Sequence, residues 1–432
     1  MVRWIVMAVL VAWQAIWWQQ AEAVAQVKMA VLSDTHVMAP QLLVSDGTAW
    51  QQFLASDRKM VDRSRELFDA MVLRLKTDIR PQLLLITGDI TKDGELLSHE
   101  YVVGKLDELR AAGIKTLVIP GNHDLGTRNA LSYDGATTTK AVTATADDFA
   151  RLYARYGYGE GSEREGSTLT YCTEPVEGLV VIGIDSGENG WLSNTTLNWV
   201  CNKAEEAARQ GRQVVAMMHH PLFPHFFGVD RFVKTAVIAN YEQVRNRLAD
   251  AGIRVIFTGH VHTSDIAKGQ NGDLTRSIYD VNTGSLISYP CDYRVVTFSS
   301  DLRQLALTTG HVTALPGDAH FSDTARQRLT ASIRSQVENM SSALNLFADQ
   351  AAECFVVHAE GNEHRSERGQ QLLAQLLDIA KQAEAYAALM PSIKQTVADA
   401  EKLANSVLRD ISDYGDAKRQ NQTDDLELTI EE

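Results

Sequence analysis

The chain has 432 residues, 45% of them hydrophobic and 22% charged, with a formal net charge of −14. This length favours two domains, and the composition is typical of a globular chain rather than a disordered one. The acidic balance argues against a nucleic-acid polymer as the main partner, because such binding relies on basic patches. A small phosphorylated ligand remains compatible with it, since a metal ion can supply local positive charge.

Residues 1–25 have the pattern of a secretory signal peptide. Arg3 precedes an apolar run from Ile5 to Trp18, and small-x-small sequences follow at 21–23 and 23–25. The apolar run is shorter than the roughly 18–20 residues that a membrane span requires. We therefore expect a secreted or periplasmic mature protein without a stable membrane anchor.

Residues 27–310 alternate short β-rich runs with helical stretches, a pattern that indicates an α/β domain whose sheets are covered on both faces. Amphipathic segments lie between the runs, at 61–76 and 196–210. The expected strands are short runs rich in Val, Ile and Leu: Val27–Leu32, Leu83–Ile86, Leu117–Ile119, Leu179–Ile184, Val214–Met218 and Val255–Phe257.

The stretch 126–168 is looser, with Gly, Thr and Ser, but one helix is expected in it near 147–156. Thr145 stands before this helix and Asp148 three residues further on. The two side chains can therefore cap its first turn reciprocally.

After about residue 315 the pattern becomes helical. Apolar residues recur at intervals of three and four, and strand signals largely vanish, so we expect three or four helices with breaks near Gly361 and Pro391. The last residues, TDDLELTIEE, are acidic and are expected to be frayed. The predicted organisation is a signal peptide at 1–25, an α/β domain at 26–314 and a small all-α domain at 315–432.

Five of the apolar runs end in side chains that can bind metals. Asp-x-His and His-x-His spacing places two side chains on the same side of an extended segment, and the adjacent glycines permit tight turns. Mixed carboxylate, amide and imidazole ligands suit Mn, Fe, Zn or Co rather than a calcium cage or a thiolate site. The five strand ends are Ser33-Asp34-Thr35-His36, Thr87-Gly88-Asp89, Pro120-Gly121-Asn122-His123-Asp124, His219-His220-Pro221 and Thr258-Gly259-His260-Val261-His262.

Taken in this order, the motifs resemble those of the calcineurin-like metallophosphoesterase family over roughly residues 27–300. The segment LLLITGDITKDGE, followed by VIPGNHD, is most similar to the branch that contains class III cyclic-nucleotide phosphodiesterases. Lys92 occupies the place of the iron-binding tyrosine of purple acid phosphatases, and the GDxxDRG motif of phosphoprotein phosphatases is absent. The resemblance implies a four-layer αββα sandwich, to which the C-terminal all-α domain would be an addition.

The resemblance also implies a role for each matched residue in binding two transition-metal ions (Mn, Fe, Zn or Co). His219 is preferred to His220 because the family's ligand directly follows its strand, two residues before Pro221. His123 would face the leaving-group oxygen, and Asp124 could either orient it or be only a loop residue that forms hydrogen bonds. The seven side chains expected to converge within about 8–10 Å are Asp34, His36 and His262 on the first ion, Asp89 between both ions, and Asn122, His219 and His260 on the second.

The implied activity is hydrolysis of a phosphate mono- or diester by attack of a metal-bridging hydroxide. The partner would be a small phosphorylated substrate, such as a nucleotide or cyclic nucleotide. Phospholipid head groups and phospho-sugars are the alternatives. A non-catalytic binding scaffold is the alternative from another class, and the complete ligand set argues against it. The oligomeric state stays open.

Several other residues near these motifs admit two interpretations. His99 and His225 are expected not to be ligands, although His225 could line the pocket. Arg128 is interpreted as a solvated loop residue, with substrate contact as the alternative. The aromatic cluster of Phe223, Phe226 and Phe227 could equally form a pocket wall or pack under a loop.

The four cysteines are Cys172, Cys201, Cys291 and Cys354. Their even number and the expected export favour one or two disulfides, with buried free thiols as the alternative. We expect Cys291, just downstream of the last metal motif, to pair with Cys354 on the helical tail. Such a bridge would hold the helical domain near the metal motifs.

Overall fold

The computed structural model describes residues 26–57, 59–127, 129–225, 235–340, 348–360, 367, 371 and 426–429. All six expected strands are present, and their bounds agree with the sequence pattern to within two residues. They are β1 (Val27–Leu32), β2 (Leu83–Ile86), β3 (Lys115–Val118), β8 (Leu179–Ile184), β9 (Gln213–Met218) and β10 (Val255–Thr258).

These strands belong to two sheets. The six-stranded sheet has the order β15-β14-β13-β1-β2-β3, and the seven-stranded sheet has the order β11-β12-β10-β9-β8-β7-β6. The neighbours β1, β2 and β3 are parallel, as are β8, β9, β10 and β12. The remaining strands are β4 (Leu131–Asp134), β5 (Thr137–Lys140), β6 (Ser162–Arg164), β7 (Tyr171–Val176), β11 (Asp265–Gln270), β12 (Ser277–Asn282), β13 (Asp292–Phe298), β14 (Gln304–His311) and β15 (Leu426–Thr429).

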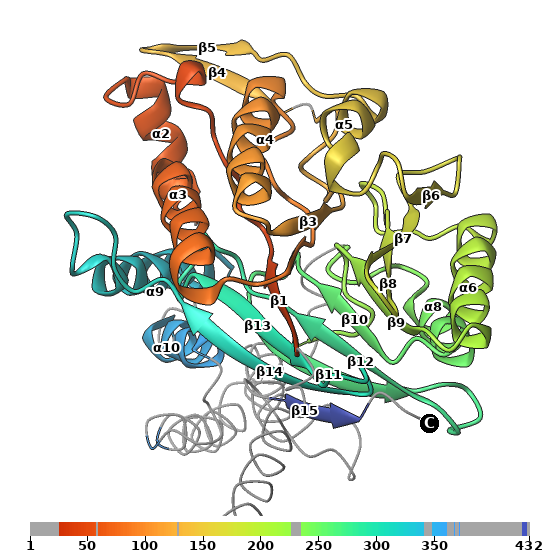
Figure 1. Ribbon diagram of the computed structural model, residues 1–432. Coiled ribbons are helices and arrows are strands. Elements are labelled where there is room, and N and C mark those ends of the chain that lie inside the picture. The colour runs from red at the N-terminus through yellow and green to blue at the C-terminus, as the bar shows by residue number, and fades with distance from the viewer. Residues whose placement is uncertain are drawn as a thin grey trace, which may run out of the picture.

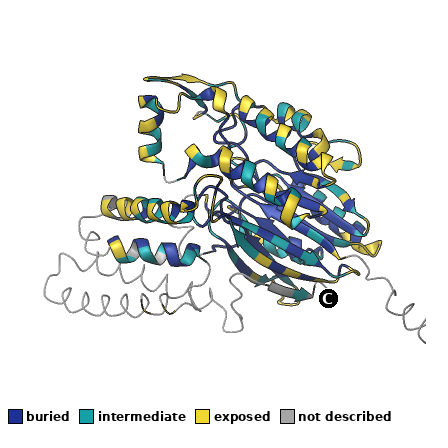
Figure 2. Cartoon of the chain, turned by 60° about the vertical axis from the view of Figure 1, so that its left-hand side comes forward, coloured by how far each residue is buried: buried dark blue, intermediate teal, exposed yellow. Residues whose placement is uncertain are grey.

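Helices cover the outer faces of the sheets (Figure 1). Helices α3 and α4 lie on the side of the six-stranded sheet, and α6 and α8 pack on the seven-stranded sheet. Figure 2 shows the strands as the buried centre and the helices with exposed outer faces. The helical elements are η1 (Pro40–Leu42), α2 (Thr48–Ser56), η2 (Val61–Arg63), α3 (Ser64–Arg74), η3 (Leu75–Ile79), α4 (Leu96–Ala111), α5 (Ala146–Leu152), η4 (Ala154–Tyr156), α6 (Asn194–Arg209), α8 (Tyr241–Asp250), α9 (Phe321–Met340) and α10 (Ala348–Ala359).

The alternation of side chains along the central strands creates two apolar layers. In β8, Val181 belongs to the core between the sheets, whereas its neighbours Val180 and Ile182 pack with α6 and α8. The strands β9 and β10 alternate in the same way, with Val215 and Phe257 facing inward. Because both faces are covered, these strands are continuous apolar runs. The fold is therefore the four-layer αββα sandwich that the family resemblance implies.

The helix expected near 147–156 consists of α5 followed by η4. The predicted cap is confirmed, because the Thr145 side chain accepts a hydrogen bond from the backbone N–H of Asp148 and the Asp148 carboxylate accepts one from the backbone N–H of Thr145. Such reciprocal capping satisfies two backbone donors that the first turn leaves free.

Two expectations for the C-terminal part are wrong. Leu426–Thr429, expected to be frayed, form β15, which pairs with β14 at the edge of the six-stranded sheet. Cys291 is a free thiol, only 1% exposed in the main core, so the expected bridge to Cys354 does not form. Cys172 and Cys201 are free thiols as well.

Other expectations concern parts of the chain outside the described residues: the signal peptide at 1–25, the helices expected beyond residue 371, Arg128, Phe226 and Phe227. Of the expected C-terminal helical domain, the described residues show α9 and α10, which pack on each other. None of the described helices combines the length and the apolar character needed to cross a membrane.

Candidate metal centre and active site

The polar strand ends meet where the two sheets adjoin. After β1 and β2, the N–H of Asp34 donates to the carbonyl of Gly88 and the N–H of His36 donates to the carbonyl of Asp89. The other sheet joins them through the backbone N–H of His260, which donates to the Asp34 carboxylate over 2.9 Å. The carboxyl ends of the parallel strands in both sheets therefore converge on one site.

A first group of possible metal ligands consists of Asp34, His36 and His262. Asp34 Oδ1 lies 3.2 Å from His262 Nε2 and 3.8 Å from His36 Nε2. The two imidazole Nε2 atoms face each other at 3.3 Å. Asp34 and His36 are fully buried, so both side chains are held away from solvent.

A second group consists of Asp89, His219 and His260. Asp89 Oδ2 lies 3.3 Å from His219 Nε2, which in turn lies 3.2 Å from His260 Nδ1. The amide oxygen of Asn122 approaches the same His219 Nε2 at 3.0 Å. The structure thus places four of the seven predicted side chains together here, three from this group and Asn122.

Asp89 lies between the two groups. Its Oδ2 atom is 3.7 Å from His36 Nε2 in the first group and 3.3 Å from His219 Nε2 in the second. The structure therefore brings all seven predicted side chains to one site, with Asp89 at the position that a bridging ligand would occupy.

Several residues of the site have a strained backbone conformation. Five of the seven predicted ligands have φ in the left-handed region, which is unfavourable for residues with a Cβ: Asp34 (50°), His36 (39°), Asp89 (47°), His260 (73°) and His262 (63°). Conformations of this kind cost about 1–3 kcal/mol each and cluster at functional sites. Neighbouring glycines make the close approach possible, because a Cβ on Gly121 would lie only 2.2 Å from Asp89 Oδ1.

The donor atoms fit a pair of transition-metal ions. In each group, two imidazole nitrogens face each other at 3.2–3.3 Å. Both nitrogens cannot donate a proton to each other, but both can direct their lone pairs at a cation between them. Among the described residues, none donates a hydrogen bond of good geometry to the buried Asp34 Oδ1, although His262 Nε2 lies 3.2 Å away. Oxygen and nitrogen donors without thiolate are compatible with Mn, Fe, Zn or Co.

The electrostatics favour the metal-binding ionisation states of Asp34, Asp89 and His260, whereas His219 must lose a proton to bind a metal. Burial alone would raise the pKa of Asp34 and Asp89, but the neighbouring histidines outweigh it and lower both values. Burial, aided by the charge of His219, lowers the pKa of His260 to about 3. Burial opposes the protonation of His219, yet the charge of Asp89 raises its pKa to about 9. A cation bound to His219 would therefore replace a proton that Asp89 stabilises.

His123 lies beside both groups without joining either. Its ring centroid is 5.0 Å from that of His36, and its backbone N–H donates to Asp89 Oδ1 over 2.8 Å. Burial disfavours the charged ring, but Asp89 and a hydrogen bond with Asp93 outweigh it and raise the pKa of His123. This placement agrees with a role at the leaving group rather than as a ligand.

Of the two interpretations of Asp124, the structure favours the loop residue that forms hydrogen bonds over the residue that orients His123. The fully buried Asp124 carboxylate instead accepts hydrogen bonds from the backbone N–H groups of Ile90, Thr91 and Gly121. It therefore ties the loop after β3 to the loop after β2 and acts on the site through the backbone.

Asp93 holds the His123 ring, with 2.8 Å between Asp93 Oδ1 and His123 Nδ1. Lys92 forms a short ion pair with Asp93, and its ammonium lies 4.6 Å from the centre of the Phe53 ring. The sequence analysis missed Asp93, because the motif TKDGE carries no spacing that distinguishes this carboxylate from a turn residue. Lys92, which replaces the tyrosine of purple acid phosphatases, is thus occupied in supporting Asp93.

The substitution Asp93→Asn should lower kcat/KM by about 10–100-fold, the usual effect of losing an outer-shell partner. The amide keeps the size of the side chain but loses the charge that favours a protonated His123. Steady-state rates on a substrate with a poor leaving group and on one with 4-nitrophenolate would be compared, alongside the melting temperature. If kcat/KM fell equally for both leaving groups, this would contradict the idea that Asp93 acts through His123.

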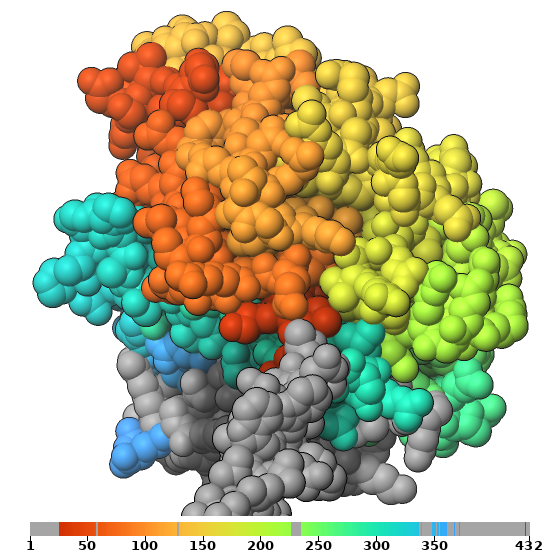
Figure 3. Space-filling model, in the orientation of Figure 1, coloured from red at the N-terminus to blue at the C-terminus, as the bar shows by residue number. Residues whose placement is uncertain are grey.

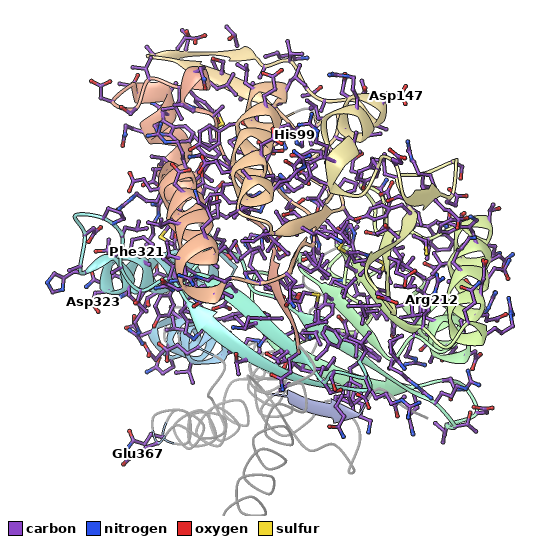
Figure 4. The ribbon with its side chains drawn as sticks, in the orientation of Figure 1. His99, Asp147, Arg212, Phe321, Asp323 and Glu367 are labelled. Atoms are coloured by element: carbon purple, nitrogen blue, oxygen red, sulfur yellow. The ribbon has the colours of Figure 1, made fainter. Side chains whose placement is uncertain are left out.

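Two further histidines lie near the groups but outside them. His220 is buried, and its Nδ1 forms a 2.8 Å hydrogen bond with Ser186 rather than pointing to the second group, which supports the preference for His219. His99, labelled on α4 in Figure 4, bonds through Nδ1 to the hydroxyl of Tyr153 and through Nε2 to the carbonyl of Asp124. As expected, His99 is not a member of either group.

His225 is part of a separate buried cluster. Its Nδ1 lies 2.8 Å from Asp265 Oδ2 and its Nε2 lies 3.2 Å from Asp280 Oδ2. Burial opposes its charge, but the two carboxylates raise its pKa to about 9. Asp280 also accepts hydrogen bonds from the backbone N–H groups of Leu222 and Phe223. The cluster therefore fixes the segment that follows His219 and His220.

The free energy of unfolding should fall as the pH rises through the pKa of His225. An unfolded histidine titrates near about 6.5, so the contribution of the His225 cluster is complete below that pH and is lost by about pH 9. The expected decrease in the free energy of unfolding is on the order of 2–3 kcal/mol. Urea denaturation between pH 6 and 9 would measure it. The variant His225→Gln should show a flatter profile, and an unchanged profile would contradict the assignment.

Comparisons with known proteins agree with this architecture. A family model described as calcineurin-like phosphoesterase matches residues 27–264, so the chain belongs to the calcineurin-like phosphoesterase family. A 3′,5′-cyclic-nucleotide phosphodiesterase from Nostoc sp. is 25% identical over 246 residues, which cover 55% of this chain and 71% of that protein. The chain is accordingly a metal-dependent phosphoric ester hydrolase.

Two solved structures are similar at low sequence identity. A dimetal phosphatase from Danio rerio has a TM-score of 0.47 and 13% identity, covering 66% of this chain and 96% of the other. A purple acid phosphatase from yellow lupin has a TM-score of 0.44 and 10% identity, covering 66% of this chain and 52% of the other.

Proposed function

We propose that this protein is a dimetal phosphodiesterase that hydrolyses a small nucleotide diester, of which a 3′,5′-cyclic nucleotide is the simplest example. The observation that carries the proposal is the position of Asp89 between two complete ligand groups. Asp34, His36, Asp89 and His262 would hold one ion, and Asp89, Asn122, His219 and His260 the other. Mn, Fe, Zn and Co are the ions that suit these donors.

The bound ions would neutralise the phosphoryl oxygens and lower the pKa of a water molecule near the ester. The chain itself supplies the proton for the leaving group. Asp93 holds Nδ1 of His123, which leaves Nε2 as the ring atom able to donate to the departing oxygen. Asp124 keeps the backbone on either side of His123 in place through its three hydrogen bonds to backbone N–H groups.

Two features support a nucleotide substrate. One is the similarity of the chain to a relative named as a 3′,5′-cyclic-nucleotide phosphodiesterase. The other is the motif pair LLLITGDITKDGE and VIPGNHD. Phospholipid head groups and phospho-sugars are the competing substrates. A non-catalytic scaffold has no need for strained ligands and a supported His123, and both are present here.

We further propose that the protein is exported, on the basis of the signal-peptide pattern in residues 1–25, and that it acts without a nucleic-acid polymer as partner. N-terminal sequencing of the protein recovered from the periplasm or medium would test the export. A mature chain that still begins at Met1 would contradict it.

A substrate panel on metal-loaded protein would test the activity. It would contain bis(4-nitrophenyl) phosphate, 4-nitrophenyl phosphate, 3′,5′-cyclic nucleotides, glycerophosphodiesters and sugar phosphates. The proposal expects the highest kcat/KM on a nucleotide diester. Faster turnover of a glycerophosphodiester or a sugar phosphate would assign the enzyme to a competing class, and metal binding without any turnover would favour the scaffold.

A further inference from the structure

The loop of residues 285–291, between β12 and β13, lies against the first ligand group. The Ser285 hydroxyl donates to the backbone carbonyl of Asp34 over 2.8 Å, and the Ser288 hydroxyl lies 3.4 Å from Nδ1 of His262. Both serines are buried. The 285–291 loop therefore contacts two of the three members of this group, one at its backbone and the other at its ring.

The Ser288 contact bears on how His262 can bind a cation. Nε2 of His262 points into the group, 3.2 Å from Asp34 Oδ1 and 3.3 Å from Nε2 of His36. If Nε2 offers its lone pair to a cation, the proton of the neutral ring must be on Nδ1, and Ser288 is then its acceptor. Outer partners of this kind fix the orientation of a ligating histidine. Since 3.4 Å is long for a hydrogen bond, the position of the loop decides how well the bond forms.

The other side of the 285–291 loop is held by the end of α10. The Tyr289 hydroxyl donates to Oε1 of Glu360, the residue that follows α10, over 2.8 Å. Burial and this hydrogen bond raise the pKa of Tyr289, so the hydroxyl keeps its proton. The same Oε1 accepts a hydrogen bond from Arg326 of α9 over 3.3 Å, and Arg326 also pairs with Glu353 of α10. Tyr289 is thus bonded to a carboxylate that contacts of both helices hold in place.

Helix α9 is in turn attached to the domain that carries the metal centre. Arg328 on α9 donates to the Asp62 carboxylate over 2.6 Å and to the carbonyl of Lys59 over 3.3 Å. Close by, the Arg63 guanidinium lies over the ring of Phe321, the first residue of α9. Figure 3 shows the cyan start of α9 packed against the orange segment that contains η2 and α3. These contacts do not involve Tyr289, so the helices are supported independently of it.

We infer that Ser288 and Tyr289 are positioning residues of the first metal site, and that α10, through Glu360, sets the position of the loop that orients His262. The inference rests on the proposed dimetal centre and gives the helical part of the chain a role in it. Neither residue is expected to touch the substrate.

The effect should be confined to the ion bound by the first group. In the second group, Nδ1 of His219 lies 2.9 Å from the carbonyl of Thr87, and Nε2 of His260 lies 3.0 Å from the carbonyl of Thr235. These outer partners are backbone atoms from other parts of the chain. A shift of the 285–291 loop should therefore weaken one ion and leave the other unchanged.

The first test measures metal binding in Tyr289→Phe by titrating the metal-free full chain with Mn²⁺ in a calorimeter. One of the two ions should bind about 3–10-fold more weakly, since a displacement of the ring by a fraction of an ångström is sufficient for this. Glu360→Ala should have the same effect, and Glu360→Gln, which keeps an acceptor, should restore part of the affinity. The matched control is Tyr101→Phe, whose hydroxyl also donates to a carboxylate, that of Asp69, and it should match the wild type.

The second test asks whether Ser288 acts through His262. Ser288→Ala should weaken the same ion about tenfold, as expected for the loss of an outer partner. In a His262→Asn background the change should have no further effect, and in an Asn122→Ala background it should keep its full effect. The control Ser299→Ala removes a hydroxyl that donates to Asp301 in the turn between β13 and β14, and it should leave both ions unchanged.

The outcomes separate the inference from the proposed function. Wild-type protein that does not bind two ions, or that binds them and hydrolyses no ester, would overturn the proposed function. If active wild type bound two ions and Ser288→Ala did not alter either affinity, His262 would not be oriented by Ser288. Weakening by Ser288→Ala but not by Tyr289→Phe would overturn the role of α10. A lower melting temperature of metal-free Tyr289→Phe with unchanged affinities would show that Tyr289 serves packing alone.

Discussion

Replacing Asp89 by alanine should reduce kcat/KM by about 10³-fold or more, which corresponds to roughly 4 kcal/mol of transition-state stabilisation. Asp89 Oδ2 is the carboxylate atom that approaches histidines of both ligand groups. Its loss removes the negative charge that both metal sites share, and metal content should fall as well. Turnover of bis(4-nitrophenyl) phosphate and elemental analysis of the purified protein would measure the two effects.

The matched control is Asp147→Ala, which removes an exposed aspartate from α5 (Figure 4). It should leave both turnover and metal content unchanged. An Asp89→Ala variant with normal metal content and activity within tenfold of the wild type would show that the carboxylate does not bridge the ions.

Replacing His123 by asparagine should have the second largest effect, about 10²–10⁴-fold on kcat for a nucleoside leaving group, the usual contribution of a general acid. For 4-nitrophenolate the loss should be much smaller, because this leaving group departs without a proton. The pair of substrates therefore distinguishes proton donation from mere support of the site. Rates on a 3′,5′-cyclic nucleotide and on bis(4-nitrophenyl) phosphate would be compared at saturating metal.

His320→Asn serves as the control, because this histidine has a side chain that is 88% exposed in the turn before α9. It should behave as the wild type on both substrates. Equal losses for the two leaving groups in His123→Asn would exclude a proton-donor role for His123.

The sequence contained most of the information about the ligand set. Asp34, Asp89 and His260 each follow a short apolar run, and parallel strands in a layered α/β fold end on one side. The family resemblance then favoured His219 over His220, because the family's ligand directly follows its strand. Local order along the chain was sufficient here, because each motif lies at the end of its own strand.

The contacts of residues around the ligands were predicted less well from the sequence than the ligands themselves. Asp124 directly follows His123, and adjacency suggested a contact that does not exist, whereas Asp93 reaches the ring from another loop. Similarly, Cys291 was expected to pair with Cys354, whereas its thiol is free and buried in the core. These contacts depend on which way a side chain points, and sequence spacing does not specify this in loops.

By itself, the sequence determined the covered strands and the metal-capable residues that end them, because alternation, apolar runs and strand-end motifs are local features. The family resemblance added the four-layer sandwich and a role for each residue. Only the tertiary structure decided that Asp93 holds the His123 ring and that Arg328 of α9 donates to the carbonyl of Lys59. It also decided that Leu426–Thr429 complete the six-stranded sheet. The physical reason is that these contacts join residues far apart in the chain, from 30 positions to more than 250 positions. The sequence near either partner does not indicate which distant residue or sheet edge it will contact.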